Sequence, residues 1–141
     1  MALWIIYALL SAVFAALVAI FGRIGLQDVD STLATSIRAV VMALFLFFVS
    51  LSLGKLNLLH TIKSKTLLFI VLSGVAGAMS WLFYFFAIKT GVVSGVAALD
   101  RLSVVFVVIF SILFLGESLN LFTALGAILI TIGAILMVIK K

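Results

Sequence analysis

Asp100 and Arg101 stand side by side in "GVAALDRLSVV", residues 95–105, a stretch that is otherwise apolar or weakly polar. A carboxylate in such surroundings can carry a proton or a cation, and a guanidinium can bind an anionic group. Adjacent residues of a helix point about 100° apart, so the two side chains cannot share one direction and one of them needs a further partner. We expect that partner to be Arg38, which lies in another apolar stretch.

Two roles are open for these three charges. They could form a buried clamp that fixes the packing of helices. They could instead line a substrate path in which Asp100 carries a proton or a cation. The residue types are compatible with both roles.

The stretch "SWLFYFF", residues 80–86, supplies a second group of side chains with chemical potential. Trp81 and Tyr84 are three residues apart and share a helical face, where Trp81 is suited to stack on a flat or cationic solute. Tyr84 is equally suited to anchor the helix at a membrane interface. We add Trp81, Tyr84 and Ser80 to Arg38 and the Asp100–Arg101 pair as candidate residues of a substrate or ion pathway.

The composition of the chain determines what kind of protein holds these side chains. The chain has 141 residues, of which 67% are hydrophobic and 9% charged, and its mean hydropathy is +1.56. A soluble domain carries roughly 25% charged residues, so the sequence predicts an all-α integral membrane protein that is surrounded by lipid. The net charge of +5 does not indicate nucleic-acid binding, because the basic residues are scattered between apolar runs.

Five segments are long and apolar enough to cross a bilayer as helices, which takes about 20 residues. They are residues 3–21, 33–53, 67–88, 92–115 and 121–139. The connections between them are short, so consecutive helices must run antiparallel, and we expect a single five-helix domain over residues 1–141. Asp30 or Ser31 can cap the second helix, and Ser118 or Asn120 the fifth.

The chain has no proline, so we expect any bend to occur at a glycine such as Gly74, Gly77 or Gly95. Two other glycines, Gly126 and Gly133, are seven residues apart on one face of the last helix and would allow close approach of another helix. That helix belongs either to the same subunit or to a second copy of the chain.

Basic residues outside the spans are almost evenly divided between the two ends of the helices. Three lie on the side of the N-terminus (side A) and four on the other side (side B): Lys55, Lys63 and Lys65 on A, and Arg23, Lys89, Lys140 and Lys141 on B. The positive-inside rule therefore favours neither orientation. A single orientation fixed by other features and a dual topology are both open, and in the second case two inverted copies would form the inverted-repeat architecture of transporters.

Enzymatic and metal chemistry are not indicated. The chain has no cysteine, and its single histidine, His60, has no ligand residues beside it in the sequence. No nucleophile stands beside a base, so we expect neither an enzyme nor a metal site nor a cofactor.

The run from the third span to the end of the chain resembles the EamA-type domain of the drug/metabolite transporter superfamily. Its motifs are "LFLGE" at the end of the fourth span and "GAILITIGAIL" in the fifth, and Asp100-Arg101-Leu102-Ser103 is typical of the short five-helix branch of bacteria and archaea. The four-helix relatives use a glutamate in their first helix, and the first span here contains no acid, so their multidrug mechanism does not carry over.

The resemblance implies a secondary transporter of a small organic metabolite, which works by alternating access in the plasma membrane of a bacterium or archaeon. The spacing of Gly126 and Gly133 resembles the dimer helix of the four-helix exporters. We therefore expect a homodimer, preferably antiparallel, in which the fifth helix holds the pair together. The alternative is a membrane subunit that transports nothing and assists the assembly of another carrier or channel.

Overall fold

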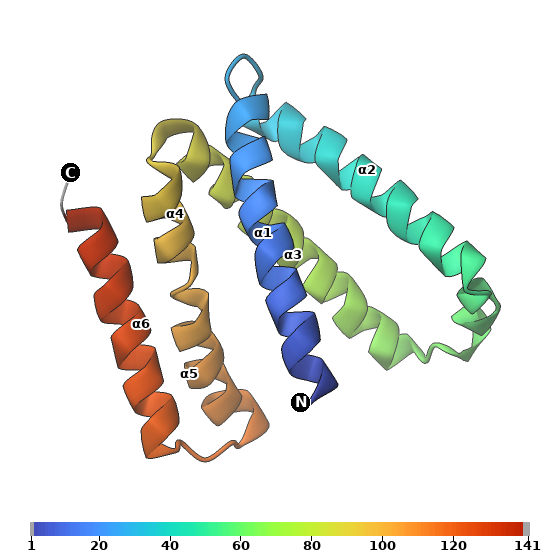
Figure 1. Ribbon diagram of the computed structural model, residues 1–141. Helices are drawn as coiled ribbons and strands as arrows, with labels where there is room; N and C mark the ends of the chain where they lie inside the picture. The colour runs from blue at the N-terminus through green and yellow to red at the C-terminus, as the bar shows by residue number, and fades with distance from the viewer. Residues whose placement is uncertain (1, 140–141) are drawn as a thin grey trace. The chain divides into compact units, whose positions relative to one another are not determined.

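The computed structural model describes residues 2–139 and shows helices joined by short connections (Figure 1). Lys140 and Lys141, which enter the charge balance above, lie outside the described residues. Between residues 2 and 139 there is no β-strand, and five helical segments are long and apolar enough to cross a membrane. The predictions of an all-α chain and of five spans are thus confirmed.

The helices have the following bounds: α1 Leu3–Gly25, α2 Ser31–Ser52, the short 3-10 helix η1 Lys55–Thr61, α3 Ser64–Thr90, α4 Val93–Asp100, α5 Ser103–Leu115 and α6 Leu121–Ile139. Three of these helices, α1, α2 and α3, extend at one or both ends beyond the apolar runs that predict them, because the ends of a span include polar residues that reach the membrane surface. The polar connection after the second span is not an irregular loop, since most of it forms η1.

Two of the predicted helix caps are present. The Asp30 carboxylate accepts hydrogen bonds from the backbone N–H groups of Thr32 and Leu33, at 2.8 and 3.1 Å, and so caps α2. The Asn120 side-chain oxygen accepts one from the N–H of Phe122 at 3.0 Å and caps α6. These contacts satisfy N–H groups that the first turn of a helix leaves without a partner.

The described chain divides into two compact units, which are considered separately. Unit 2 comprises residues 22–89 and includes α2, η1 and most of α3. Its most buried apolar side chains are Leu26, Phe85 and Ile88, which are at most 3% exposed. The Phe85 ring lies 3.2 Å from the point that a Cβ on Gly22 would occupy, so the absence of a side chain there lets the end of α1 approach α3 closely.

Unit 1 comprises residues 2–21 and 90–139 of the described chain, and in it α4 and α5 both lie against α6 (Figure 1). Gly95 is buried, and Val138 lies 3.6 Å from the point where a Cβ on it would be. The Gly95 face of α4 therefore packs on the end of α6. Gly126 and Gly133 have no neighbour within 4 Å of their Cβ points, so their face of α6 is open within unit 1.

The fourth span is not one continuous helix. It ends as α4 at Asp100 and resumes as α5 at Ser103, and between them the N–H groups of Arg101 and Leu102 bond to carbonyls three residues back, at 3.2 and 2.9 Å. This tight 3-10 turn contains neither glycine nor proline, so the expectation that bends occur at glycines is wrong for this span. α3 is continuous through Gly74 and Gly77.

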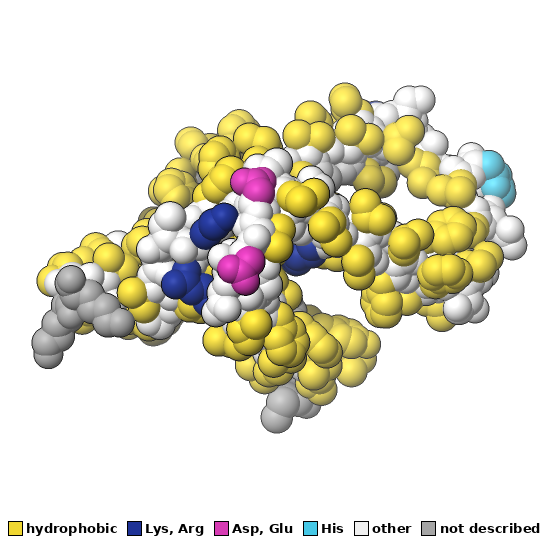
Figure 2. Space-filling view, turned by 90° about the horizontal axis from the view of Figure 1, so that it is seen from above, with side chains coloured by type: hydrophobic (Ala, Val, Ile, Leu, Met, Phe, Trp, Pro, Cys, Tyr) yellow, Lys and Arg dark blue, Asp and Glu magenta, His cyan; other side chains and the backbone are white. Residues whose placement is uncertain are grey.

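Most of the surface is hydrophobic (Figure 2). Large apolar side chains such as Phe114 and Phe122 are 78% and 80% exposed, whereas few side chains of the described residues are buried. In water such a surface would be unstable, but in a bilayer it is the surface that meets the lipid tails. The interior is correspondingly small, and a polar side chain inside a span stands out.

Candidate functional site

Arg38 of α2 is stacked on Trp81 of α3, within unit 2. The central carbon of its guanidinium lies 3.6 Å from the centre of the Trp81 ring and 5.5 Å from that of Phe85. Both distances are within the range of a cation–π interaction, and indole is the strongest partner for one. The structure thus brings together two of the predicted pathway residues, through a contact that the sequence analysis did not anticipate.

The Trp81 ring is itself held by aromatic neighbours. Tyr84 and Phe85 both meet it edge to face, with ring centres 5.4 and 6.1 Å away and interplanar angles of 83°. Phe85 is buried, so it anchors the group in the packed part of unit 2. We name Arg38, Trp81, Tyr84 and Phe85 the arginine–aromatic site.

Phe85 was missed as a site residue, although its spacing contained the signal. It follows Trp81 by four residues and therefore lies on the same face of α3. Arg38 lies over one face of the Trp81 ring, so the use of that ring to stack on a flat or cationic solute stays a prediction. Ser80 is exposed on α3, where it is one residue away from the face of the site.

Stacking on Trp81 only partly compensates for the free-energy cost of placing the charge of Arg38 inside a membrane span. An arginine near the centre of a span costs about 2.5–3.5 kcal/mol on insertion scales, whereas a cation–π contact contributes about 0.5–2 kcal/mol. Arg38 is half-buried, and it is the eighth residue of α2, about 10 Å from the start of that helix. The rest of its cost must be met by water or by an anionic partner.

The second charged group lies at the break of the fourth span, in unit 1. An Arg101 nitrogen is 3.8 Å from an Asp100 oxygen, and the two side chains are 55% and 37% exposed. The sequence predicts a continuous helix here, in which neighbouring side chains could not share one direction. They pair nevertheless at the break between α4 and α5, since the long side chain of Arg101 can reach back towards its neighbour.

Asp100 therefore has a partner in its own unit and does not require Arg38. The two residues belong to different units, so their pairing stays a prediction. Arg38 and Asp100 are each the eighth residue of their helix. α2 begins at Ser31, two residues earlier than predicted, and α4 begins at Val93.

A third polar group joins the helix ends of unit 2 on side B. Arg23 donates hydrogen bonds to the carbonyls of Ile88 and Lys89 at the end of α3, the second at 2.7 Å. The Lys89 ammonium donates to the Val29 carbonyl at 2.8 Å. These cations satisfy carbonyls that the end of a helix and the adjoining loop would otherwise leave free. Sequence analysis counted Arg23 and Lys89 only as charges that set orientation.

Asp30, beside this group, has a pKa below its ordinary value of 3.8. The main cause is the hydrogen bond that its carboxylate accepts from the Leu33 N–H, and the positive charge of Lys89 acts in the same direction. The capping contact thus favours the ionised carboxylate.

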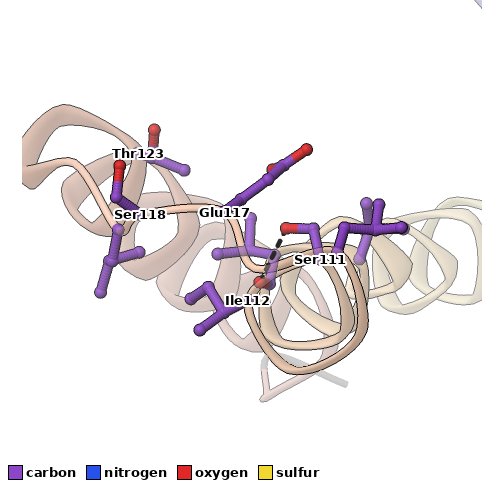
Figure 3. Close-up of a pocket in the computed structure, with 9 residues that line it drawn as sticks. Ser111, Ile112, Glu117, Ser118 and Thr123 are labelled. Atoms are coloured by element: carbon purple, nitrogen blue, oxygen red, sulfur yellow. Dashed lines mark hydrogen bonds between the residues drawn. The ribbon is translucent and has the colours of Figure 1, made fainter.

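A shallow cavity of about 260 Å³ lies in unit 1, between the end of α5 and the start of α6 (Figure 3). Its polar lining residues are Ser111, Glu117, Ser118 and Thr123, and the Ser111 hydroxyl donates to the Val108 carbonyl. Gly116 closes α5 in a left-handed conformation, with φ of 68°, and the Glu117 N–H bonds back to the Ser111 carbonyl. This helix cap gives the "LFLGE" motif a structural role, because glycine adopts that conformation without strain.

Among the described residues there is no group of three or more histidines, cysteines or acids that could hold a metal ion.

The chain is similar to known proteins of one family. The model of the EamA-like transporter family matches residues 2–139. The chain is also 45% identical over 136 residues to "Uncharacterized transporter in cobO 3'region" of Sinorhizobium sp, and the match covers 96% of each chain. No solved structure matches the chain. The family match confirms the expectation of a transporter rather than an enzyme. This chain, with its charged residues at a broken membrane span and an arginine stacked on tryptophan, belongs to the EamA-like transporter family.

Proposed function

We propose that this multi-pass membrane protein is a secondary transporter that moves a small organic metabolite by alternating access. The observation that carries the proposal is the break of the fourth span at Asp100 and Arg101. Transporters commonly form their substrate and ion sites where a membrane helix is interrupted, because the interruption presents charges and backbone groups to a cavity. Asp100 ends α4 after eight residues, about 12 Å into the span.

Asp100 is the ion carrier in this proposal, and Arg38, Arg101, Trp81, Tyr84 and Ser80 line the pathway. A half-exposed carboxylate paired with a single arginine can exchange its proton without a large rearrangement. Arg101 supplies a positive charge 3.8 Å from that carboxylate. In this scheme one proton or cation accompanies each solute.

The functional unit in this proposal is an antiparallel homodimer of five-helix domains, in the plasma membrane of a bacterium or archaeon. The open face of Gly126 and Gly133 on α6 supports a dimer contact there, because another helix could approach it closely. The near-even charge balance supports insertion in both orientations.

Orientation is tested with a cysteine appended after Lys141, which is the only thiol because the native chain has none. A thiol reagent that cannot cross the membrane is added to intact cells. Labelling of about half the molecules is expected for dual topology. Labelling of all or none would contradict it and would leave a parallel dimer or an oppositely inserted partner.

Transport is tested in liposomes that contain the purified protein and an internal pH indicator. Solute-dependent proton movement is expected for the native chain, and Asp100→Asn should abolish it. Unchanged pH-dependent flux in that variant would contradict the carrier role of Asp100. Reversal of both charges, Arg38→Asp with Asp100→Arg, tests the predicted pair, and failure to restore what each single reversal destroys would count against it.

A further inference from the structure

We propose that the arginine–aromatic site binds an anionic oxygen group, a carboxylate or a phosphate, and that the transported solutes are accordingly small organic anions. This inference rests on the proposed transport function and adds the class of substrate. It starts from the partners of Arg38.

Arg38 has no carboxylate partner in its own unit. Residues 22–89 contain two acids, Asp28 and Asp30, and neither lies within ion-pair distance of Arg38. Asp30 is engaged at the start of α2. Asp100, the acid that sequence analysis assigned to Arg38, is paired with Arg101. A permanent cation inside a span has therefore been kept without a fixed counter-ion in its unit.

The stack on Trp81 leaves the hydrogen-bonding capacity of Arg38 unused. A guanidinium is planar, carries five N–H donors around its edge, and does not lose its charge in proteins. With its centre 3.6 Å above the ring, the group uses a face for the contact, and its N–H edge remains available. That edge matches a carboxylate or a phosphate, which can accept two parallel hydrogen bonds.

The surroundings of Trp81 make this edge a defined site. Tyr84 and Phe85 meet the ring edge to face and restrict its rotation, so the orientation of the guanidinium is restricted as well. Arg38 and Trp81 are both half-buried, so a solute can reach the edge in partly dehydrated surroundings. Charge-assisted hydrogen bonds are stronger there than in water. A cationic solute is disfavoured because the positive charge of Arg38, which lies over one face of the Trp81 ring, repels it.

The test measures equilibrium binding through the fluorescence of Trp81, in a Trp4→Phe background that leaves Trp81 as the sole tryptophan. The protein is placed in phosphatidylcholine bilayers, and succinate, inorganic phosphate, choline and glycerol are titrated. We expect a saturable change with succinate or phosphate and none with choline or glycerol. Arg38→Gln should weaken anion binding by tenfold or more, whereas Lys63→Gln, in a polar connection, should leave it unchanged.

Arg38→Lys keeps the charge and tests the inference even where Arg38→Gln fails to fold. Lysine lacks the planar guanidinium that can donate two parallel hydrogen bonds, so the affinity of the Arg38→Lys variant for the anion should fall severalfold but not vanish. Unaltered affinity in both variants, or saturable binding of choline in the native chain, would overturn the inference.

A lipid headgroup could supply the same anionic oxygens, so the titration is repeated in bilayers that contain phosphatidylglycerol. A response to succinate or phosphate in pure phosphatidylcholine supports a soluble anion. A response to phosphatidylglycerol alone would make Arg38 a lipid site and overturn the assignment of substrate.

Flux measured in the same phosphatidylcholine vesicles separates this inference from the transport proposal. Anion binding that depends on Arg38 without any flux would refute transport and leave the anion site standing. Flux of choline or glycerol that is indifferent to Arg38→Gln would refute the anion class and leave transport standing.

Discussion

The two arginines that lie inside membrane spans are stabilised in opposite ways. Arg101 of unit 1 has a carboxylate beside it, whereas Arg38 of unit 2 has an indole ring and no carboxylate from its own unit. A carboxylate neutralises the charge of an arginine, but an aromatic ring stabilises that charge without neutralising it. The comparison indicates that Arg101 serves its neighbour Asp100, while Arg38 remains able to bind a further anion.

The backbone also differs between the two arginines, being a continuous helix around Arg38 and a turn around Arg101. Arg38 lies in the continuous helix α2, where the rigid backbone gives it one position relative to Trp81. Arg101 lies in the turn between α4 and α5, where the helical hydrogen bonds are replaced by shorter-range ones. A broken span can change conformation at lower cost than a continuous one, so we assign the movable ion site to unit 1 and the fixed anion site to unit 2.

The largest effect is expected at the carboxylate of the paired site. Asp100→Asn keeps the size of the side chain but removes its charge and its proton exchange, so proton-coupled flux should be abolished. The measurement is the initial rate of proton movement in proteoliposomes as a function of pH. Asp100→Glu, which keeps the carboxyl group, serves as the control and should retain pH dependence.

The next largest effect is expected at the ring that holds the unpaired arginine. Trp81→Leu removes the ring that orients the Arg38 guanidinium, and ordering a side chain on binding costs about 0.5–1.5 kcal/mol, so the KM for the transported solute should rise roughly 2–13-fold. Trp81→Phe keeps an aromatic face, although a weaker one, so its KM should lie between the KM of the native chain and that of Trp81→Leu. A rise in KM for Trp81→Leu that Trp81→Phe shares in full would contradict the cation–π role.

A smaller effect, on stability and not on transport, is expected at the side B end of unit 2. Arg23→Gln removes charged hydrogen bonds to the end of α3, so unfolding should become easier by about 1 kcal/mol. Thermal unfolding in detergent should show a midpoint lower by about 3 °C, with Lys63→Gln as the control. An unchanged midpoint would mean that water replaces Arg23 at these carbonyls without loss.

The smallest effect is expected at Asp30. Its pKa is lowered in the folded chain, so it contributes stability that is present above the ordinary value of 3.8 and is lost as the pH falls through the folded pKa. Asp30→Asn can still cap α2 but does not titrate, so it should remove this part of the acid sensitivity. Unfolding midpoints at neutral pH and near pH 3 measure it, and equal acid sensitivity in both proteins would contradict the assignment.

The sequence by itself determined the class of protein, the five spans and two helix caps. Spans follow from composition and length alone, because a bilayer imposes one requirement on every helix that crosses it. Caps at Asp30 and Asn120 follow from local chemistry, since the capping side chain and the N–H groups that it serves are within a few residues. The family motifs could likewise be read directly, because "LFLGE" encodes a local helix cap at Gly116.

The partner that each charge inside a span has within its own unit follows from the tertiary structure and not from the sequence. The sequence predicts a continuous helix over Asp100 and Arg101, and the tight turn that separates α4 from α5 contains no residue type that would predict it. The stacking of Arg38 on Trp81 joins α2 and α3 across 42 intervening residues and depends on how the helices are rotated about their axes. Apolar residues cover every side of helices in lipid, so hydrophobic periodicity does not reveal which face turns inward. For that reason the packing of unit 2, and not the sequence pattern, shows that Arg38 lies against an aromatic ring and has no carboxylate beside it in that unit.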